Sequence, residues 1–177
     1  LNLNIKTKSD YNLIKSDSLP EKKLIYNLSE QKQVEELSVI LSSDRFSEVQ
    51  SRLRNAGMRT GFCSLFYGSP GTGKTETVYQ IARATGRDIL RVDVDKIKSC
   101  WVGESEQNIK KLFDRYRNIC KDSTLAPILL FNEADAILGI RMEGATRAVD
   151  KMENSIQNII LQEMEALDGI MIATTNL

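Results

Sequence analysis

The eight residues from Gly68 to Thr75 read GSPGTGKT and match the pattern G-x-x-x-x-G-K-[ST] at every position. A short apolar run, residues 65–67, precedes them, and a helical run follows. In that context the pattern predicts a strand, a phosphate-binding loop and a helix whose N-terminus faces a triphosphate. A plain glycine-rich turn between strand and helix would not need a lysine followed by a threonine.

Each position of this loop has an expected role in holding a nucleotide. The glycines permit backbone conformations closed to other residues, so that successive N–H groups can point at phosphate. Lys74 is expected to reach the β and γ phosphates, and the Thr75 hydroxyl a Mg²⁺ ion. The predicted nucleotide-binding residues are Gly68, Ser69, Pro70, Gly71, Thr72, Gly73, Lys74, Thr75 and Glu76.

Composition limits the function classes that remain. With 177 residues, 41% of them hydrophobic, the chain is long enough for one α/β core and too short for two comfortable domains. Lys plus Arg equals Asp plus Glu at 24 each, so no overall field attracts nucleic acid or an acidic membrane surface. Histidine is absent, which excludes Ser-His and Cys-His catalysis, so any general base must be a carboxylate or another group.

The three cysteines and the apolar runs bear on location. The cysteines are odd in number and lack metal-ligand spacing, which favours a reducing compartment over a disulfide framework. No apolar run approaches the ~20 residues of a membrane span. We therefore predict a cytoplasmic protein.

Apolar periodicity predicts alternating helices and strands after a polar, lysine-rich segment at residues 1–28, which we interpret as an extended arm or an edge strand. Strands are expected at 61–67, 89–94, 128–131 and 170–173, and helices at 29–42, 43–56, 74–84, about 105–120 and 150–167. This alternation predicts an α/β fold, a three-layer P-loop NTPase architecture with a mostly parallel sheet and helices on both faces, preceded by two helices. The expected domain runs over residues 29–177.

Two of the expected strands end in polar residues suited to nucleotide chemistry. Ligands bind beyond the carboxyl ends of parallel strands, where Asn132 and Glu133 follow one run and Asn176 closely follows another. A carboxylate at Glu133 can polarise a water for attack on the γ-phosphate. The amide of Asn176 can hold that water, since it both donates and accepts. Alone, Glu133 could equally be an acid at a helix N-terminus; beside a complete phosphate loop the catalytic interpretation is favoured.

With these residues in place, the chain resembles the AAA-type (AAA+) ATPases, ring-forming motors that include proteasomal ATPases, membrane-bound proteases and severing enzymes. GSPGTGKT resembles their Walker A motif, ILLFNEADAI at 128–137 their Walker B strand, and IATTN at 172–176 their sensor 1. The resemblance implies ATP as substrate, Mg²⁺ as cofactor, and catalytic roles for Lys74, Glu133 and Asn176. It also implies a homo-oligomer, hexameric when complete, that acts on a protein substrate.

The segment WVGESEQNIKKLF at 101–113 resembles the central pore loop of that family, which grips substrate polypeptide. The resemblance implies that Trp101, Val102 and Gly103 line a pore. From the residues alone, a single tryptophan before a glycine is more often a packed surface aromatic. Residues 139–147 resemble the second, lower pore loop by position, and a mobile connection is at least as good an interpretation.

Two departures from the family pattern affect the expected activity. Asn132 stands where the family usually has an aspartate that helps to hold Mg²⁺ through its water shell, so Thr75 and Asn132 remain as metal-associated residues, the latter indirectly. The sequence also ends at Leu177, whereas the family's arginine finger, fifth core strand and helical lid follow sensor 1. The resemblance is thus to the large α/β subdomain of the module, and this chain alone is expected to be a poor ATPase.

Three functions remain open from the sequence. The favoured one is Mg-dependent ATP hydrolysis in a ring that remodels or unfolds a protein. The second is a nucleotide-binding scaffold or switch in which Asn132 leaves ATP bound and barely hydrolysed. The third, a nucleic-acid motor or loader, is disfavoured by the balanced charge and the aromatic pore segment.

Overall fold

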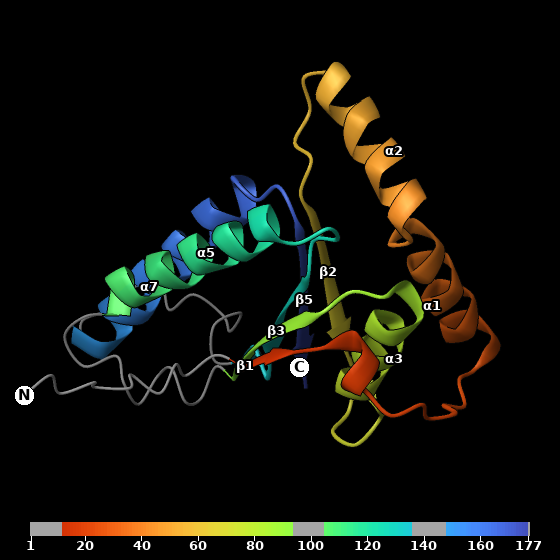
Figure 1. Ribbon diagram of the computed structural model, residues 1–177. Coiled ribbons are helices and arrows are strands. Elements are labelled where there is room, and N and C mark those ends of the chain that lie inside the picture. Colours follow the sequence, from red (N-terminus) through yellow and green to blue (C-terminus); the bar gives the residue numbers. More distant parts are fainter. Residues whose placement is uncertain (1–11, 94–104, 136–147, 177) are drawn as a thin grey trace, which may run out of the picture.

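A computed structural model describes residues 12–93, 105–135 and 148–176, and the fold is given for these ranges (Figure 1). Their strands form one sheet in the order β1-β3-β4-β5-β2. The strands are β1 (Asn12–Ile14), β2 (Phe62–Tyr67), β3 (Ile89–Asp93), β4 (Ile128–Asn132) and β5 (Ile170–Thr175). β2 to β5 are parallel, and β1 alone pairs antiparallel, at the edge beside β3.

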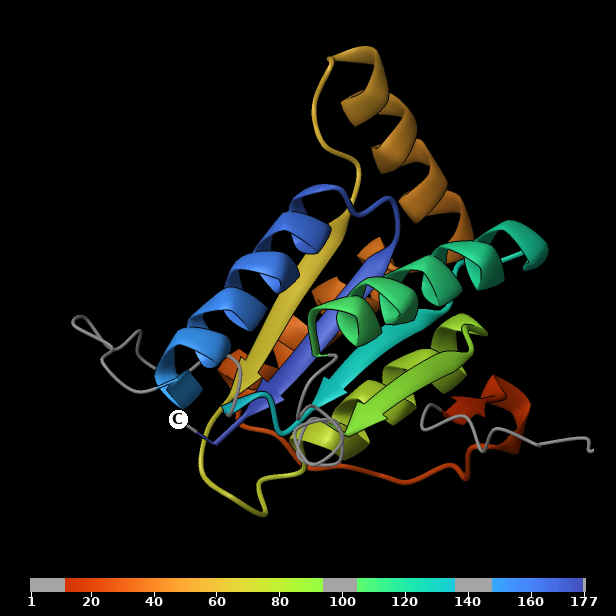
Figure 2. The same ribbon diagram turned by 90° about the vertical axis from the view of Figure 1, so that its left-hand side faces the viewer.

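Helices cover both faces of the sheet, which makes three layers (Figures 1 and 2). α1 (Leu28–Ile40) and α3 (Lys74–Thr85) lie on one face, and α5 (Ser105–Asp122) and α7 (Ala148–Glu165) on the other. α2 (Ser43–Asn55) projects away from the sheet. The predicted α/β fold, with a mostly parallel sheet preceded by two helices, is confirmed. No helix of the described part of the chain is long and apolar enough to cross a membrane.

Two apolar clusters lie on opposite faces of the sheet because neighbouring residues of a strand point to opposite sides. The cluster under α5 and α7 includes Leu129, Phe131 and Met171, and Phe131 stacks on Phe113 with ring centroids 6.0 Å apart. The cluster under α3 is built from the alternate strand residues together with Val78, Ile81 and Ala82 of that helix and Leu41 from the end of α1. Every residue of β4 and β5 is buried, as expected for central strands covered on both faces.

Several element boundaries differ by one or two residues from the sequence-based predictions. β5 continues through Thr174 and Thr175, because both pair with β2. The last helix begins and ends two residues earlier than the predicted 150–167. Within residues 1–28, predicted to be an extended arm or an edge strand, β1 is such an edge strand, while the first eleven residues lie outside the described part.

Candidate functional site

The loop that matched the phosphate-binding pattern connects β2 to α3, at the carboxyl edge of the sheet. Gly71 and Gly73 adopt φ angles of +78° and +86°. A Cβ at either position would have open space, so glycine is required there by backbone conformation and not by room. Directly before the first turn of α3, the loop therefore has a backbone conformation at positions 71 and 73 that would be strained for any residue other than glycine.

One line of hydrogen bonds runs from the loop to the end of β5. The Lys74 ammonium donates to the carbonyls of Gly68 and Ser69 at 2.8 and 2.9 Å, and to Oδ1 of Asn176 at 2.9 Å. Asn176 in turn donates its backbone N–H to Oδ1 of Asp135 at 2.6 Å. The two predicted residues Lys74 and Asn176 are thus in direct contact, and Asp135 is a third member that the motifs did not single out.

A second line of hydrogen bonds starts at the next residue, Thr75. The Thr75 hydroxyl donates to Oδ1 of Asn132 at 2.7 Å, and the Thr174 hydroxyl lies 3.4 Å from the same oxygen. The Thr174 hydroxyl also accepts from the backbone N–H of Glu133 at 3.2 Å. Asn132 is buried. This line joins the first turn of α3 to the ends of β4 and β5.

The residues of this second line can take part in holding Mg²⁺ only in a limited way. Thr75 and Asn132 offer two hard oxygens within hydrogen-bond distance of each other, which suits this ion. Within the described residues, no cluster of three or more histidine, cysteine, aspartate or glutamate side chains could hold a metal. The donor set fits a Mg²⁺ that keeps most of its ligands from phosphate and water.

Glu133 lies on a strained stretch of backbone. Its φ is +58°, and it is the one non-glycine residue with a positive φ among the residues that the structure describes. Such conformations cost free energy and persist where the surroundings fix them, which occurs often at functional sites. Two hydrogen bonds hold this conformation. The Glu133 N–H donates to the Thr174 hydroxyl, and the Ala134 N–H donates to the Thr174 carbonyl at 2.8 Å. The Glu133 side chain is exposed.

These side chains surround a cavity of about 390 Å³. Lys74, Thr75 and Glu133 line it together with Asn176, so two strand ends and one helix N-terminus converge on it. The remaining lining residues are Pro70, Gly71, Gly73, Glu76, Tyr79, Thr174 and Thr175. An acid, a cation, a hydroxyl and an amide therefore face one space, which is what phosphoryl transfer requires of a protein.

A second and larger cavity, about 610 Å³, adjoins the other side of the loop. Its walls come from the arm at residues 25–27, from α1 through Gln33, Val34 and Leu37, and from the end of β2. Lys74 lines both cavities. No sequence motif predicted this wall, and the apolar residues 24–26 in an otherwise polar arm were its only signal.

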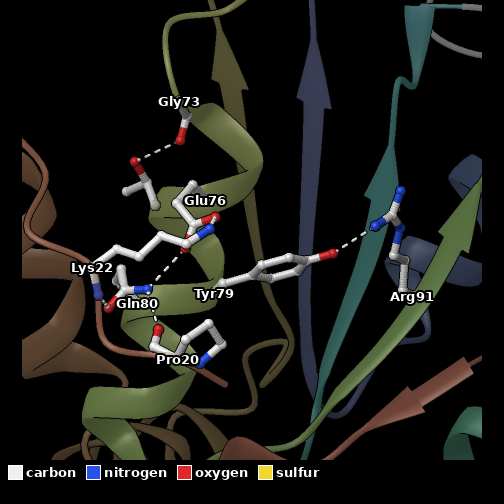
Figure 3. Close-up of polar contacts among 8 residues, drawn as sticks. Pro20, Lys22, Gly73, Glu76, Tyr79, Gln80 and Arg91 are labelled. Carbon is white, nitrogen blue, oxygen red and sulfur yellow. Dashed lines mark hydrogen bonds and ion pairs between the residues drawn. The ribbon is translucent and has the colours of Figure 1, made fainter. Parts of the chain in front are cut away.

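The arm is held along α3 by hydrogen bonds (Figure 3). Lys22 pairs with Glu76 at 2.8 Å, and Gln80 donates to Glu76 at 2.9 Å and to the Pro20 carbonyl at 3.0 Å. Partial burial works against ionisation of Glu76, but the hydrogen bonds from Lys22 and Gln80 and the Lys22 charge outweigh it and lower the pKa of that carboxyl. Glu76, which was predicted to bind nucleotide, is thus also an anchor for the arm.

A further contact joins the arm to the phosphate loop itself. The Tyr26 hydroxyl lies 3.0 Å from that of Thr77, which in turn donates to the carbonyl of Gly73 at 3.0 Å. Beyond this, the Tyr79 side chain points from α3 to Arg91 of β3 and hydrogen-bonds it at 2.7 Å (Figure 3). Arg91 also pairs with Asp93 at 2.8 Å.

The residues predicted to line a pore, Trp101, Val102 and Gly103, lie outside the described residues, as does the segment 139–147. Their proposed roles stay predictions. All other predicted site residues lie on the loop, on the first turn of α3, or at the ends of β4 and β5.

Comparison with known proteins assigns this arrangement to a family. Residues 64–177 match the family model described as "ATPase family associated with various cellular activities (AAA)". Cell division protein C of Sulfolobus acidocaldarius is 32% identical over 103 residues, which cover 58% of this chain and 26% of that protein. Peroxisomal ATPase PEX1 of Saccharomyces cerevisiae is 33% identical over 117 residues, 65% of this chain and 10% of the relative.

A third relative, the 26S proteasome regulatory subunit 7 homolog B of Arabidopsis thaliana, is 33% identical over 105 residues, 59% of this chain and 21% of its own length. The chain thus spans between a tenth and about a quarter of these relatives. Among solved structures, the crystal structure of the FIGL-1 AAA domain matches with a TM-score of 0.61 at 15% identity, over 96% of this chain and 51% of that one. This likeness supports the fold.

Proposed function

Since the chain belongs to the AAA family of ATPases, we propose that it binds ATP on residues 68–76 and hydrolyses the bond between the β and γ phosphates. The observation that carries the proposal is the convergence of Lys74, Thr75, Glu133 and Asn176 on one cavity. The triphosphate would lie along the loop at the N-terminus of α3, where backbone N–H groups and the helix dipole favour negative charge. We propose that the adenine base of ATP lies in the adjoining cavity beside Tyr26.

The proposed division of labour follows from charge and reach. The exposed Glu133 carboxylate would accept a proton from the attacking water, since the chain has no histidine for that task. Lys74 would neutralise charge on the transferred phosphoryl group, and Asn176, 2.9 Å from it, would keep the ammonium in place. The left-handed backbone at Glu133 would hold its carboxylate aimed at the cavity instead of along the strand.

Thr75 and Asn132 are the residues proposed to stand beside Mg²⁺. The ion, when bound with the nucleotide, would supply positive charge to the β and γ phosphate oxygens. Asn132 gives an oxygen without the charge of an aspartate, so its side chain would orient the Thr75 hydroxyl and a metal-bound water more than it would bind the metal. We therefore expect weaker metal affinity with activity retained.

At the level of the assembly, we propose a ring of identical subunits that remodels a protein substrate. The support is the family membership and the names of relatives such as the proteasome regulatory subunit. Trp101, Val102 and Gly103 are the proposed pore residues, and the cytoplasm is the proposed location. The balanced charge makes nucleic acid an unexpected substrate.

Asn132 favours a second candidate, a nucleotide-binding scaffold that hydrolyses ATP barely or not at all. In that case the bound nucleotide would govern a partner, and Glu133 would be idle. The two candidates differ in turnover and not in binding, because both require Lys74.

The experiment that tests the proposal is the steady-state Mg-ATPase rate of the natural full-length protein as a function of its concentration, with Glu133→Gln in parallel. A rate per subunit that rises with concentration and disappears in the variant supports active sites completed between neighbours. A flat rate near background, with ATP bound, contradicts hydrolysis and favours the scaffold.

A further inference from the structure

We propose that Asp135 is a positioning residue, which fixes the side-chain amide of Asn176 so that the amide oxygen faces Lys74. Asp135 is half-buried three residues beyond the end of β4. Its Oδ1 accepts from the backbone N–H of Asn176 at 2.6 Å and from the Thr175 hydroxyl, and its Oδ2 lies 3.4 Å from Nδ2 of Asn176. One carboxylate thus holds both the main chain and the side chain of Asn176.

Charge decides which way the Asn176 amide points. An amide has an accepting oxygen at one end and a donating nitrogen at the other. The Asp135 carboxylate, when ionised, only accepts, and the Lys74 ammonium, 2.9 Å from Asn176 Oδ1, only donates. Turning the amide over would place nitrogen against ammonium and oxygen against carboxylate. Both contacts would then be repulsive, so the two charges together select one orientation.

This inference rests on the proposed function and adds a residue to it. Asp135 is not among the residues that line the cavity around Glu133, so it would act through Asn176 and not on the nucleotide. The line from Asp135 through Asn176 to Lys74 would hold the ammonium where the transferred phosphoryl group develops charge. Preorganised charge of this kind contributes to rate more than to ground-state binding.

A purely structural tie is the competing explanation for the same contacts. Asp135 also fastens the turn after β4 to the end of β5, beside the bond from the Ala134 N–H to the Thr174 carbonyl. If that were its whole role, its effect on activity would be independent of the Asn176 side chain. The two explanations differ in whether the effects of substituting Asp135 and Asn176 on activity are additive.

The test is a double-mutant cycle on the natural full-length protein with Asp135→Asn, Asn176→Ala and both together. In Asp135→Asn the carboxylate no longer opposes the turned-over amide of Asn176, and Lys74 alone selects its orientation. We expect kcat to fall by about tenfold or more with KM changed by less than about threefold, and the double variant to be no slower than Asn176→Ala alone. Asp135→Glu keeps the charge and is expected to recover part of the rate. This variant also tests the proposal if Asp135→Asn does not fold.

Asp168→Asn is the matched control. Asp168 likewise accepts from a threonine hydroxyl, Thr60 at 2.6 Å, and from a side-chain amide, Gln50 at 3.1 Å, but it lies before the opposite end of β5. We expect the Asp168→Asn variant to hydrolyse ATP at the wild-type rate. A loss in this variant as large as that in Asp135→Asn would overturn the proposal.

The remaining outcomes separate this inference from the proposed function. If the wild type turns over and the two single effects multiply, or Asp135→Asn equals wild type, the inference fails and the function stands. If the wild type binds ATP without turnover, the rate effect that the inference predicts does not exist, so the inference fails together with hydrolysis and nucleotide binding alone stands. A wild type that binds no nucleotide overturns both.

Discussion

The two ends of β5 each lie beside an aspartate that collects hydrogen bonds, yet the two surroundings differ. Before the strand, Asp168 accepts from Thr60, Gln50 and Arg54, so it ties α2 and the approach to β2 onto the turn before β5. After the strand, Asp135 holds Asn176, which holds Lys74, and the line ends at a cavity. A hydrogen-bond network that joins protein segments stabilises the fold, whereas a network that borders a cavity can act on a ligand.

Close packing marks the amino end as structural. A Cβ at Gly169 would lie 2.4 Å from the Tyr116 hydroxyl oxygen, and one at Gly61 would lie 2.3 Å from the Leu167 carbonyl. The carboxyl end differs, since Gly71 and Gly73 have open space around them and Glu133 has a positive φ. We therefore expect substitutions at the amino end to change stability and those at the carboxyl end to change activity.

The largest expected effect is on turnover, from Glu133→Gln. Removing the general base should lower the single-turnover rate of ATP hydrolysis by about 100-fold or more. The melting temperature should stay within about 2 °C of wild type, because the side chain is exposed and its backbone contacts remain. Glu165→Gln is the control, since Glu165 is exposed and pairs with Arg59 on the surface. A variant that melts early yet keeps its rate would break the contrast between the two ends.

Gly169→Ala should be the most destabilising change at the amino end. The new methyl group would meet the buried ring of Tyr116, and we expect a loss of about 2–3 kcal/mol in the free energy of unfolding. Urea denaturation measures the loss, and nucleotide affinity under native conditions should be unchanged. Since the nearest atom is the hydroxyl oxygen, adding Tyr116→Phe to Gly169→Ala should cost less than the sum of the two. Additive losses would contradict a clash with the hydroxyl oxygen.

Tyr116→Phe alone should have a smaller effect on stability. The buried hydroxyl accepts from the Ile170 N–H at 2.7 Å and lies 2.8 Å from the Pro127 carbonyl, so its removal leaves a buried donor without this partner. We expect a loss of about 1–2 kcal/mol by urea denaturation. Burial raises the pKa of this phenol well above its usual value, so wild type should show no Tyr116 titration below pH 10. A phenol that titrates normally would contradict its burial.

The smallest expected effect comes from weakening the contact between the arm and α3. It tests whether one residue, Glu76, can contribute both to stability and to the site. Glu76 has a pKa below its ordinary value of 4.5, so its ionised form stabilises the fold above that pH, and the contribution is lost as pH falls through the folded value. Lys22→Met should cost at most about 1 kcal/mol at pH 6, because Lys22 is half exposed. The same variant should cost less at pH 3.5. An equal cost at both values would show that packing, and not charge, holds the arm.

Prediction from the sequence succeeded where local rules apply and failed where distant segments meet. The loop at Gly68 to Thr75 and the alternation of strands and helices follow from neighbouring residues, and the fold class they implied was confirmed. Asp135 was missed because its role depends on two strand ends that lie side by side only in the sheet. The arm on α3 was missed for the same reason, since Lys22 and Glu76 are far apart in the sequence.

Equilibrium titration with Mg-ATPγS tests the central claim most directly, using the natural full-length protein, Lys74→Ala and Asp168→Asn. The claim is that the carboxyl end of the sheet holds nucleotide and the amino end holds the fold. It predicts saturable binding by wild type and by Asp168→Asn with similar affinity, and a loss of about 100-fold or more in Lys74→Ala because the phosphates lose their cation. Equal binding by wild type and Lys74→Ala, or an equal loss in Asp168→Asn, would contradict it.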